Sequence, residues 1–273
     1  MNQNQVQKPK KRSDLRRKLG KEYFCLKRKV NWFLSKEKYS INQDFQPLTY
    51  ELISHQSFLL RRLKDVDMHL QHNKTVNLRL AIAKLNGIVI KPGETFSFWK
   101  LVGRPTKLKG YLNGLTLSNG QVGKDTGGGL CQLGNLIYWM TIHTPLSITQ
   151  RWRHSYDVFP DVNRKIPFGS GATLSYNYID LQVKNNTEAD FQINIWLEEK
   201  HVHGSICSSK PLSHSYKVFE TDHKFELQWW GGYTRHNRIW REIIPKGKGE
   251  IKQELVTENH AVMMYNPLLQ NTE

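Results

Sequence analysis

The sequence is poor in cysteine and has no long apolar run. Its 273 residues include three cysteines, Cys25, Cys131 and Cys207, an odd number and too few for a disulfide framework. None of them belongs to a CxxC pair, so a zinc knuckle or a CxxC redox motif has no support, and we expect no metal ion and no cofactor. No apolar stretch approaches the roughly eighteen residues of a membrane span, and the basic N-terminus lacks the apolar segment of a secretory signal peptide. These absences predict a cytoplasmic protein.

Acidic residues are scarce relative to basic ones. The chain has 24 Asp and Glu against 40 Lys and Arg, a net charge of +16. Such a balance favours anionic partners: nucleic acid, acidic lipid or an anionic cell-wall polymer. Because 38% of the residues are hydrophobic and 11% aromatic, the chain can bury a core and is not a disordered protein.

The first 48 residues are predicted to form a basic tail followed by an amphipathic helix. Between Lys8 and Lys29 there are eleven Lys or Arg residues against two acids. Apolar residues recur every three or four positions at Leu15, Leu19, Tyr23, Leu26, Val30 and Phe33. Such a helix could lie peripherally on an anionic membrane surface or contact a nucleic-acid backbone. We favour a third interpretation, in which the apolar stripe packs on the main domain. No base-reading motif is present, so sequence-specific nucleic-acid binding is not expected.

The remainder predicts an α+β fold: a mixed, mostly antiparallel sheet packed against a central Cys-bearing helix, with the basic helical segment before it and a β-rich extension after it. Residues 49–207 form the core domain and residues 208–273 the C-terminal region. Expected helices cover part of 50–70, then 76–85 and the stretch after Gly129, which should stop near Pro145. Expected strands include 88–90, 95–99, 147–152, 172–178 and 191–197. Asn119-Gly120 predicts a two-residue hairpin turn.

Residues 125–139, D-T-G-G-G-L-C-Q-L-G-N-L-I-Y-W, contain the candidate site. The three glycines, Gly127 to Gly129, permit positive φ or a close approach of the backbone. A helical apolar period begins directly after them, which places Cys131 in the first turn of a helix. The unpaired N–H groups and the dipole there would lower the pKa of a thiol. The alternative is that Cys131 simply packs in the core, as free cysteines commonly do.

A thiol at a helix start and an imidazole on a later strand are the groups that papain-like enzymes use. Cys131 and His154 are that pair here. The carboxylates available to orient the imidazole are Asp157, Asp161 and Asp180, and the Gly127–Gly129 backbone with the Gln132 amide could stabilise an oxyanion. Alternatively, His154 belongs to a basic patch with its arginine neighbours.

Glu94 lies in the run Pro-Gly-Glu-Thr-Phe-Ser-Phe. An acid among apolar neighbours, if buried, has a raised pKa and can transfer protons. The ordinary alternative, which we favour, is that Glu94 caps a turn or pairs with an arginine.

Three motifs in order and spacing resemble the VanW family, the family of the accessory protein W encoded in vancomycin resistance clusters of the B type. They are Lys91–Trp99, the Gly-Gly-Gly-Leu-Cys-Gln run, and Ile179–Leu181 with Asn185-Asn186-Thr187. The resemblance covers roughly residues 75–200. It implies a link to glycopeptide resistance or the cell envelope without an assigned reaction. The positions that match the family are Glu94, Phe96, Ser97, Gly128, Gly129, Cys131, Gln132, His154 and Asp180.

From the residues and the resemblance together we predict two sets of site residues. The catalytic set is Cys131, His154, Asp180, Gln132 and Glu94, and the substrate-binding set is Gly127, Gly128, Gly129, Ser97 and Asp157. One position departs from the family, because many members carry an aspartate where this chain has Gly171.

Two main functions follow from this. The first is a cysteine-dependent amidase, peptidase or acyltransferase that acts on a cell-wall precursor or peptide. The second is a non-catalytic protein whose basic surface binds an anionic cell-wall or lipid-linked precursor. A third interpretation is nucleic-acid binding through the basic N-terminus. The sequence leaves the oligomeric state open.

Overall fold

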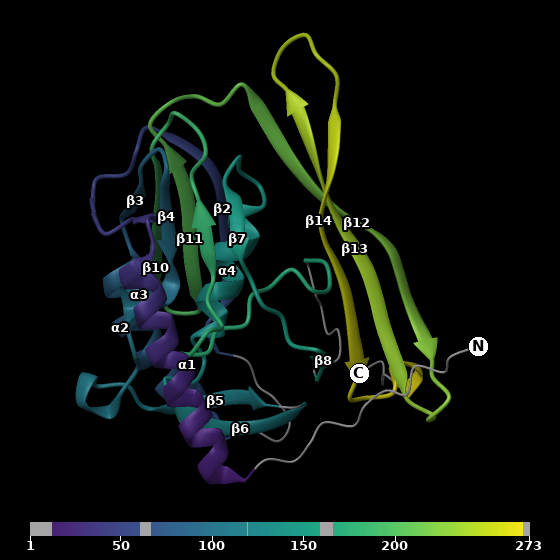
Figure 1. The fold of residues 1–273 in the computed structure, drawn as a ribbon. Coiled ribbons are helices and arrows are strands. Elements are labelled where there is room, and N and C mark those ends of the chain that lie inside the picture. Colours follow the sequence, from purple (N-terminus) through teal and green to yellow (C-terminus); the bar gives the residue numbers. More distant parts are fainter. Residues whose placement is uncertain (1–12, 61–66, 119, 159–165, 270–273) are drawn as a thin grey trace.

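The structure, a computed structural model, describes residues 13–60, 67–118, 120–158 and 166–269. These residues form a mixed α and β core and a long, strongly twisted sheet beside it (Figure 1). The helices in the described ranges are α1 (Asp14–Leu34), α2 (Met68–Leu85), α3 (Phe98–Val102) and α4 (Cys131–Thr141), with short 3-10 turns at Lys107–Lys109 and Pro267–Leu269.

Two four-stranded sheets build the core. One has the order β1-β4-β9-β7 and the other the order β2-β11-β10-β3. The strands are β1 (Lys38–Tyr39), β2 (Tyr50–Phe58), β3 (Ile88–Ile90), β4 (Glu94–Ser97), β7 (Ser147–Gln150), β9 (Gln182–Lys184), β10 (Phe191–Leu197) and β11 (His201–Ser208). All of the pairings in these two sheets are antiparallel except that of β1 with β4. The predicted α+β class with mostly antiparallel pairing is therefore confirmed, although the strands divide among several sheets.

The C-terminal residues form a third sheet of order β12-β13-β14-β8, and a separate hairpin, β5-β6, lies next to α2. The bounds are β5 (Asn113–Ser118), β6 (Gln121–Thr126), β8 (Tyr156–Asp157), β12 (His214–Leu227), β13 (Tyr233–Pro245) and β14 (Lys252–Met263). Because β8 comes from the core and pairs with β14, the C-terminal sheet is joined to the rest by backbone hydrogen bonds. The division of the chain at residues 48 and 207 stays a prediction.

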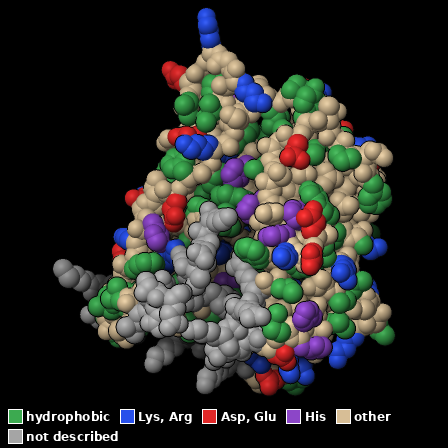
Figure 2. Space-filling view, turned by 180° about the vertical axis from the view of Figure 1, so that it is seen from behind, with side chains coloured by type: hydrophobic (Ala, Val, Ile, Leu, Met, Phe, Trp, Pro, Cys, Tyr) green, Lys and Arg blue, Asp and Glu red, His purple; other side chains and the backbone are tan. Residues whose placement is uncertain are grey.

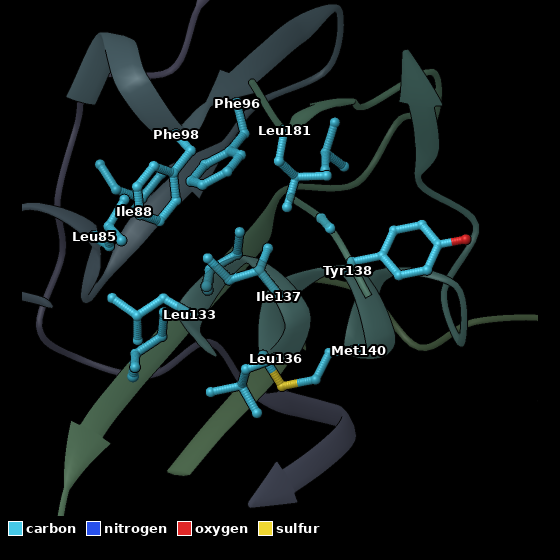
Figure 3. Close-up of a cluster of buried hydrophobic side chains, with 14 of the residues drawn as sticks. Leu85, Ile88, Phe96, Phe98, Leu133, Leu136, Ile137, Tyr138, Met140 and Leu181 are labelled. Atoms are coloured by element: carbon cyan, nitrogen blue, oxygen red, sulfur yellow. The ribbon is translucent and has the colours of Figure 1, made fainter. Parts of the chain in front are cut away.

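Helix α4 lies in the middle of the core. Leu133, Ile137 and Met140 recur at helical spacing and are fully buried (Figure 3). Leu133 and Ile137 face side chains from α2, β3 and β4, whereas Met140 lies on the side of α4 that packs on β2 and β11. Gly204 in β11 permits this approach, since a Cβ there would lie 2.8 Å from Met140 Cε. Close packing of this kind fixes the position of Cys131 at the start of α4.

Several predicted elements differ from the structure. Residues 50–58 form strand β2 rather than a helix, because they pair antiparallel with β11, a partner distant in sequence. The strand expected at 95–99 ends at Ser97, whose Oγ accepts a hydrogen bond from the Lys100 N–H and caps α3. Residues 172–178 form an irregular segment instead of a strand. Helix α2 begins well before the expected start, with Asp67 as its N-cap.

Helix α1 is present as predicted, but its apolar stripe does not pack on the main domain. Leu15, Leu19, Tyr23, Leu26, Val30 and Phe33 are 45–88% exposed. The opposite side of α1 contacts the core, where Cys25 is buried. The favoured expectation for the stripe was therefore wrong. Within the described ranges, no helix combines the length and the apolar character needed to cross a membrane.

Candidate functional site

The glycine turn before α4 has both of the properties that its sequence predicted. Gly127 and Gly129 have φ values of +79° and +95°, which side chains with a Cβ rarely adopt. Gly128 is in close contact with Gly114 of β5, and a Cβ on Gly128 would lie 2.2 Å from the Gly114 carbonyl carbon. The space beside Gly128 is therefore occupied by backbone, and that beside Gly127 and Gly129 by the side chains of Pro105 and Lys74.

A buried asparagine holds this turn in place. Asn77 Nδ2 donates to the carbonyl oxygens of Gly128 (2.9 Å) and Leu112 (3.0 Å), and its Oδ1 accepts from the Leu112 N–H (2.8 Å). Asn77 is fully buried on α2. Asn77 is not among the site residues predicted from the sequence. A polar amide on the buried face of the predicted 76–85 helix was the available signal, because a buried amide must find hydrogen-bond partners.

Cys131 is half-buried at the first residue of α4. Its Sγ accepts from the Leu174 N–H at 3.4 Å and lies 3.6 Å from the Leu174 carbonyl oxygen, to which the thiol can donate. Burial raises the pKa of the Cys131 thiol above its ordinary value, although the Leu174 N–H opposes this. The expected lowering of the pKa was wrong, because desolvation of the thiolate outweighs the helix terminus.

His154 lies in the segment that follows β7. The Thr173 N–H donates to the Trp152 carbonyl at 2.8 Å, so the segment bearing His154 runs beside the residues that contact Cys131. The His154 ring is half-buried, and burial, together with the charge of Arg153, lowers its pKa. Over the residues that the structure describes, no hydrogen bond joins Cys131 Sγ to His154. The catalytic pair stays a prediction.

Asp180 lies at the centre of a buried hydrogen-bond network. Its carboxylate accepts from Ser97 Oγ (2.6 Å), the Trp99 N–H (3.0 Å), the Leu181 N–H (2.9 Å) and Gln182 Nε2 (3.1 Å). Burial raises the pKa of the Asp180 carboxyl above its ordinary value, although the hydrogen bonds from Ser97, Trp99 and Gln182 oppose this. Two predicted site residues, Ser97 and Asp180, are therefore in contact. Their hydrogen bond connects the start of α3 to the residue that precedes β9.

Glu94 caps the turn that precedes β4. Its Oε2 accepts from the Lys91 N–H at 3.1 Å, and its own N–H donates to the Lys91 carbonyl at 2.9 Å. This is the ordinary role that the sequence analysis favoured over proton transfer. Its side chain is half-buried at the surface end of the strand.

The Gln132 side chain contacts strand β2. Its Nε2 donates to Ser57 Oγ (2.9 Å) and to the Phe58 carbonyl (2.8 Å), which joins α4 to the end of β2. An amide nitrogen has two protons, and both are directed at these acceptors. In this arrangement the amide has no proton left for an oxyanion.

Asp157, a predicted substrate-binding residue, is buried in β8 and faces the C-terminal sheet. Its Oδ2 accepts from Arg235 (3.3 Å) and from the Tyr265 hydroxyl (3.0 Å). This buried ion pair connects β8 to β13. Asp161, the remaining candidate to orient His154, lies outside the described residues.

Gly171, where many family members carry an aspartate, lies against Asn135, a residue of α4 one helical turn after Cys131. Asn135 Oδ1 accepts from the Ala172 N–H at 2.9 Å, and a Cβ on Gly171 would lie 2.5 Å from the same oxygen. Cys131 and Asn135 thus hold the irregular 172–174 segment against α4 through side-chain contacts with its backbone. Any side chain at Gly171 must displace Asn135.

Metal binding has no geometric basis in the described ranges. No group of three or more His, Cys, Asp or Glu residues there is arranged to hold an ion.

Comparison with known proteins agrees with the motifs. A family model described as VanW like protein matches residues 73–207. The chain is 38% identical to the vancomycin B-type resistance protein VanW of Enterococcus faecalis, over 75% of this chain and 74% of that protein. It is also 30% identical to the uncharacterised protein YoaR of Bacillus subtilis. That match covers 41% of this chain and 36% of the relative. No solved structure matches the chain significantly.

Proposed function

The chain belongs to the VanW-like protein family, as its motifs predicted, and from this premise we propose that it is an accessory protein of glycopeptide resistance or cell-envelope function. The similarity to the enterococcal resistance protein extends over about three quarters of both chains and supports this proposal. We further propose that it acts by binding an anionic cell-wall or lipid-linked precursor, without chemistry at Cys131.

The observation that carries this proposal is the use that the fold makes of the family residues. Side chains of the predicted catalytic set are directed at internal partners: Asp180 at Ser97, Gln132 at β2, and Glu94 at its own turn. The thiol with its raised pKa contacts the Leu174 backbone. A nucleophile needs a base within hydrogen-bond reach and a favourable pKa. The geometry supports a structural role for these residues better than a catalytic one.

The charge of the chain supports an anionic ligand. The net charge of +16 attracts anions over distances of about a Debye length, roughly 8 Å at physiological salt. On the face shown in Figure 2, Lys and Arg side chains are interspersed with Asp and Glu. Any contact with an anion there would depend on a few side chains rather than on one extended patch.

A cysteine-dependent amidase, peptidase or acyltransferase is the second candidate, and one observation favours it. Cys131 is only half-buried, and the Thr173–Trp152 hydrogen bond keeps the segment that bears His154 close to the residues that contact the thiol. In that function the sulfur would attack an amide carbonyl, His154 would pass the thiol proton to the leaving amine, and water or another acceptor would release the acyl group.

Substitution of Cys131 separates the two candidates. In a host whose glycopeptide resistance depends on this protein, we expect Cys131→Ser to retain the resistance of the native chain, because serine keeps a donor and acceptor for Leu174. Resistance is measured as the inhibitory concentration of vancomycin, with protein abundance checked on the same cultures. Lost resistance at normal abundance would overturn the binding proposal.

An electrophilic peptide amide gives an independent measurement. The binding proposal predicts slow labelling of Cys131 that does not respond to His154→Ala. Rapid labelling that His154→Ala abolishes would identify the catalytic pair instead. Cys25→Ser and Cys207→Ser, at the two buried cysteines, serve as controls for the site of labelling.

A further inference from the structure

Helix α1 presents its apolar side to solvent along its whole length. Its exposed apolar residues are Leu15, Leu19, Tyr23, Leu26, Val30 and Phe33. At 100° per residue they form one continuous stripe on a helix about 30 Å long. Soluble proteins rarely expose an apolar surface of this extent unless it meets a partner.

The opposite side of α1 is fixed to the core. Cys25 Sγ donates to the Tyr176 carbonyl at 3.1 Å, and the Arg28 guanidinium donates to Gln150 Oε1 (2.8 Å) and to the Tyr178 carbonyl (2.5 Å). Figure 1 shows α1 on the outside of the molecule, with its N-terminal end extending past the β5–β6 hairpin. The outward direction of the stripe is therefore set by specific contacts.

A salt bridge adds to this attachment. Glu22 pairs with Arg104, at 2.5 Å between the closest atoms, and Lys100 Nζ lies 5.5 Å from the centroid of the Trp32 ring. Since one of the two acids of α1 is neutralised in this way, the charge presented around the stripe is mainly positive.

Basic side chains border the stripe on both sides. Arg16 and Lys27 follow Leu15 and Leu26 and lie beyond one edge, while Lys18 and Lys29 lie beyond the other, and all four are exposed. Helix α1 carries seven Lys or Arg against two acids. A stripe of apolar side chains between two rows of positive charge matches an anionic bilayer surface, where acyl chains accept the stripe and lipid phosphates the cations.

We propose that α1 lies in the plane of a membrane containing anionic phospholipid, with the stripe inserted at the level of the headgroups. The core then rests against the lipid surface, attached to α1 through residues 176–178. These residues continue the segment that contacts Cys131, so the family motif is held near the bilayer. The inference stands independently of the proposed function, because lipid binding requires neither a precursor nor a resistance pathway.

Binding of the full chain to lipid vesicles tests the proposal. We expect binding to vesicles of phosphatidylglycerol mixed with phosphatidylcholine, and at least about tenfold weaker binding to pure phosphatidylcholine. The double substitution Leu19→Gln with Leu26→Gln should weaken binding to the anionic vesicles by about tenfold or more, since each leucine loses its transfer into the apolar layer. Lys18→Gln with Lys29→Gln should also weaken it by about tenfold and reduce its dependence on salt.

The matched control is Ile251→Gln. Ile251 is 57% exposed, close to the 63% of Leu26, and precedes β14 at the end of the C-terminal sheet that lies far from α1 in Figure 1. This control should bind like the native chain. The leucine variant should unfold at the same urea concentration as the native chain, because both side chains are already in solvent.

Other binding partners of the apolar stripe would give different results, and each of these results would overturn the proposal. If a second copy covers it, the native chain will be a dimer that the leucine substitutions dissociate, without vesicle binding. If α1 binds nucleic acid, duplex DNA will bind in a salt-dependent manner that the lysine substitutions weaken and the leucine substitutions do not. Equal binding to neutral and anionic vesicles would also contradict it.

Discussion

Helices α1 and α4 carry the same kind of apolar repeat, but α4 buries its apolar side, whereas α1 leaves its apolar side in solvent. In α4, Leu133 and Ile137 are fully buried within the core. In α1, Leu19 and Leu26 occupy the equivalent stripe and are each 63% exposed, whereas the side that carries Cys25 faces the protein. Apolar periodicity therefore specifies a helix with one apolar and one polar face, but not which of the two is buried. The hydrogen bonds and shapes available on the neighbouring elements then decide which face is buried.

The two helices also differ in what their polar residues do. In α4 the motif residues Cys131, Gln132 and Asn135 each contact backbone or side chains of other segments. In α1 most of the basic side chains remain in solvent. We conclude that α4 contributes to stability and to the family-specific architecture, while α1 contributes a surface.

Truncation of one apolar residue in each helix should give the largest difference in stability between the two helices. Ile137→Ala removes a fully buried side chain and should lower the free energy of unfolding by about 2–5 kcal/mol. Leu26→Ala should change it by no more than about 0.5 kcal/mol, because the leucine is already exposed. Urea unfolding followed by circular dichroism measures both. Equal losses would mean that α1 has a buried stripe in solution.

Replacing one glycine near each helix by alanine should change the stability of the protein in opposite directions. Gly128→Ala would place its Cβ 2.2 Å from Gly114 backbone atoms, so we expect destabilisation of about 1–3 kcal/mol or more. Gly20→Ala meets no atom within 4 Å and lies inside α1, so it should stabilise the protein by about 0.5–1 kcal/mol. Thermal unfolding of the two variants beside the native chain decides this. A neutral Gly128→Ala would contradict the close contact between Gly128 and Gly114.

The smallest expected effect is a pH dependence to which the histidines near α4 contribute. Burial lowers the pKa of His143 at the end of α4, of its neighbour His55, and of His154, each below the ordinary value of 6.5. The unfolded chain therefore takes up protons first as the pH falls. Stability should be full above pH 6.5 and should decrease as the pH falls through and below it.

Urea unfolding at pH 7.5 and at pH 5.5, values chosen to lie about one unit on either side of the ordinary histidine pKa, measures this decrease. His55→Phe should make the decrease smaller, because one of the buried imidazoles is removed. A stability that rises on acidification would contradict the assigned pKa directions.

Much of the local structure could be predicted from the sequence. The apolar period of 130–140 specified α4, the alternation in 191–197 specified β10, and the Asn119-Gly120 pair specified the β5–β6 hairpin, because each depends on neighbouring residues alone. The glycine turn was also predictable, since three consecutive glycines permit φ values that other residues avoid. The order of the motifs was sufficient to identify the family.

The candidate site was less predictable, because contacts across the sequence decide it. Ser97 and Asp180 are 83 positions apart, and only the fold shows that the acid binds that serine rather than His154. Asp157 contacts Arg235, 78 positions away, for the same reason. Residue types specify which side chains can donate, accept or titrate, whereas their partners depend on the packing of distant strands.

Helices α1 and α4, the β5–β6 hairpin, the positive charge and the family of this protein followed from the sequence alone, because short-range periodicity, turn chemistry and motif spacing depend on adjacent residues. Only the tertiary structure decided that the stripe of α1 faces solvent and that the pKa of Cys131 is raised. Both outcomes depend on desolvation, which is set by the residues that surround a side chain in space.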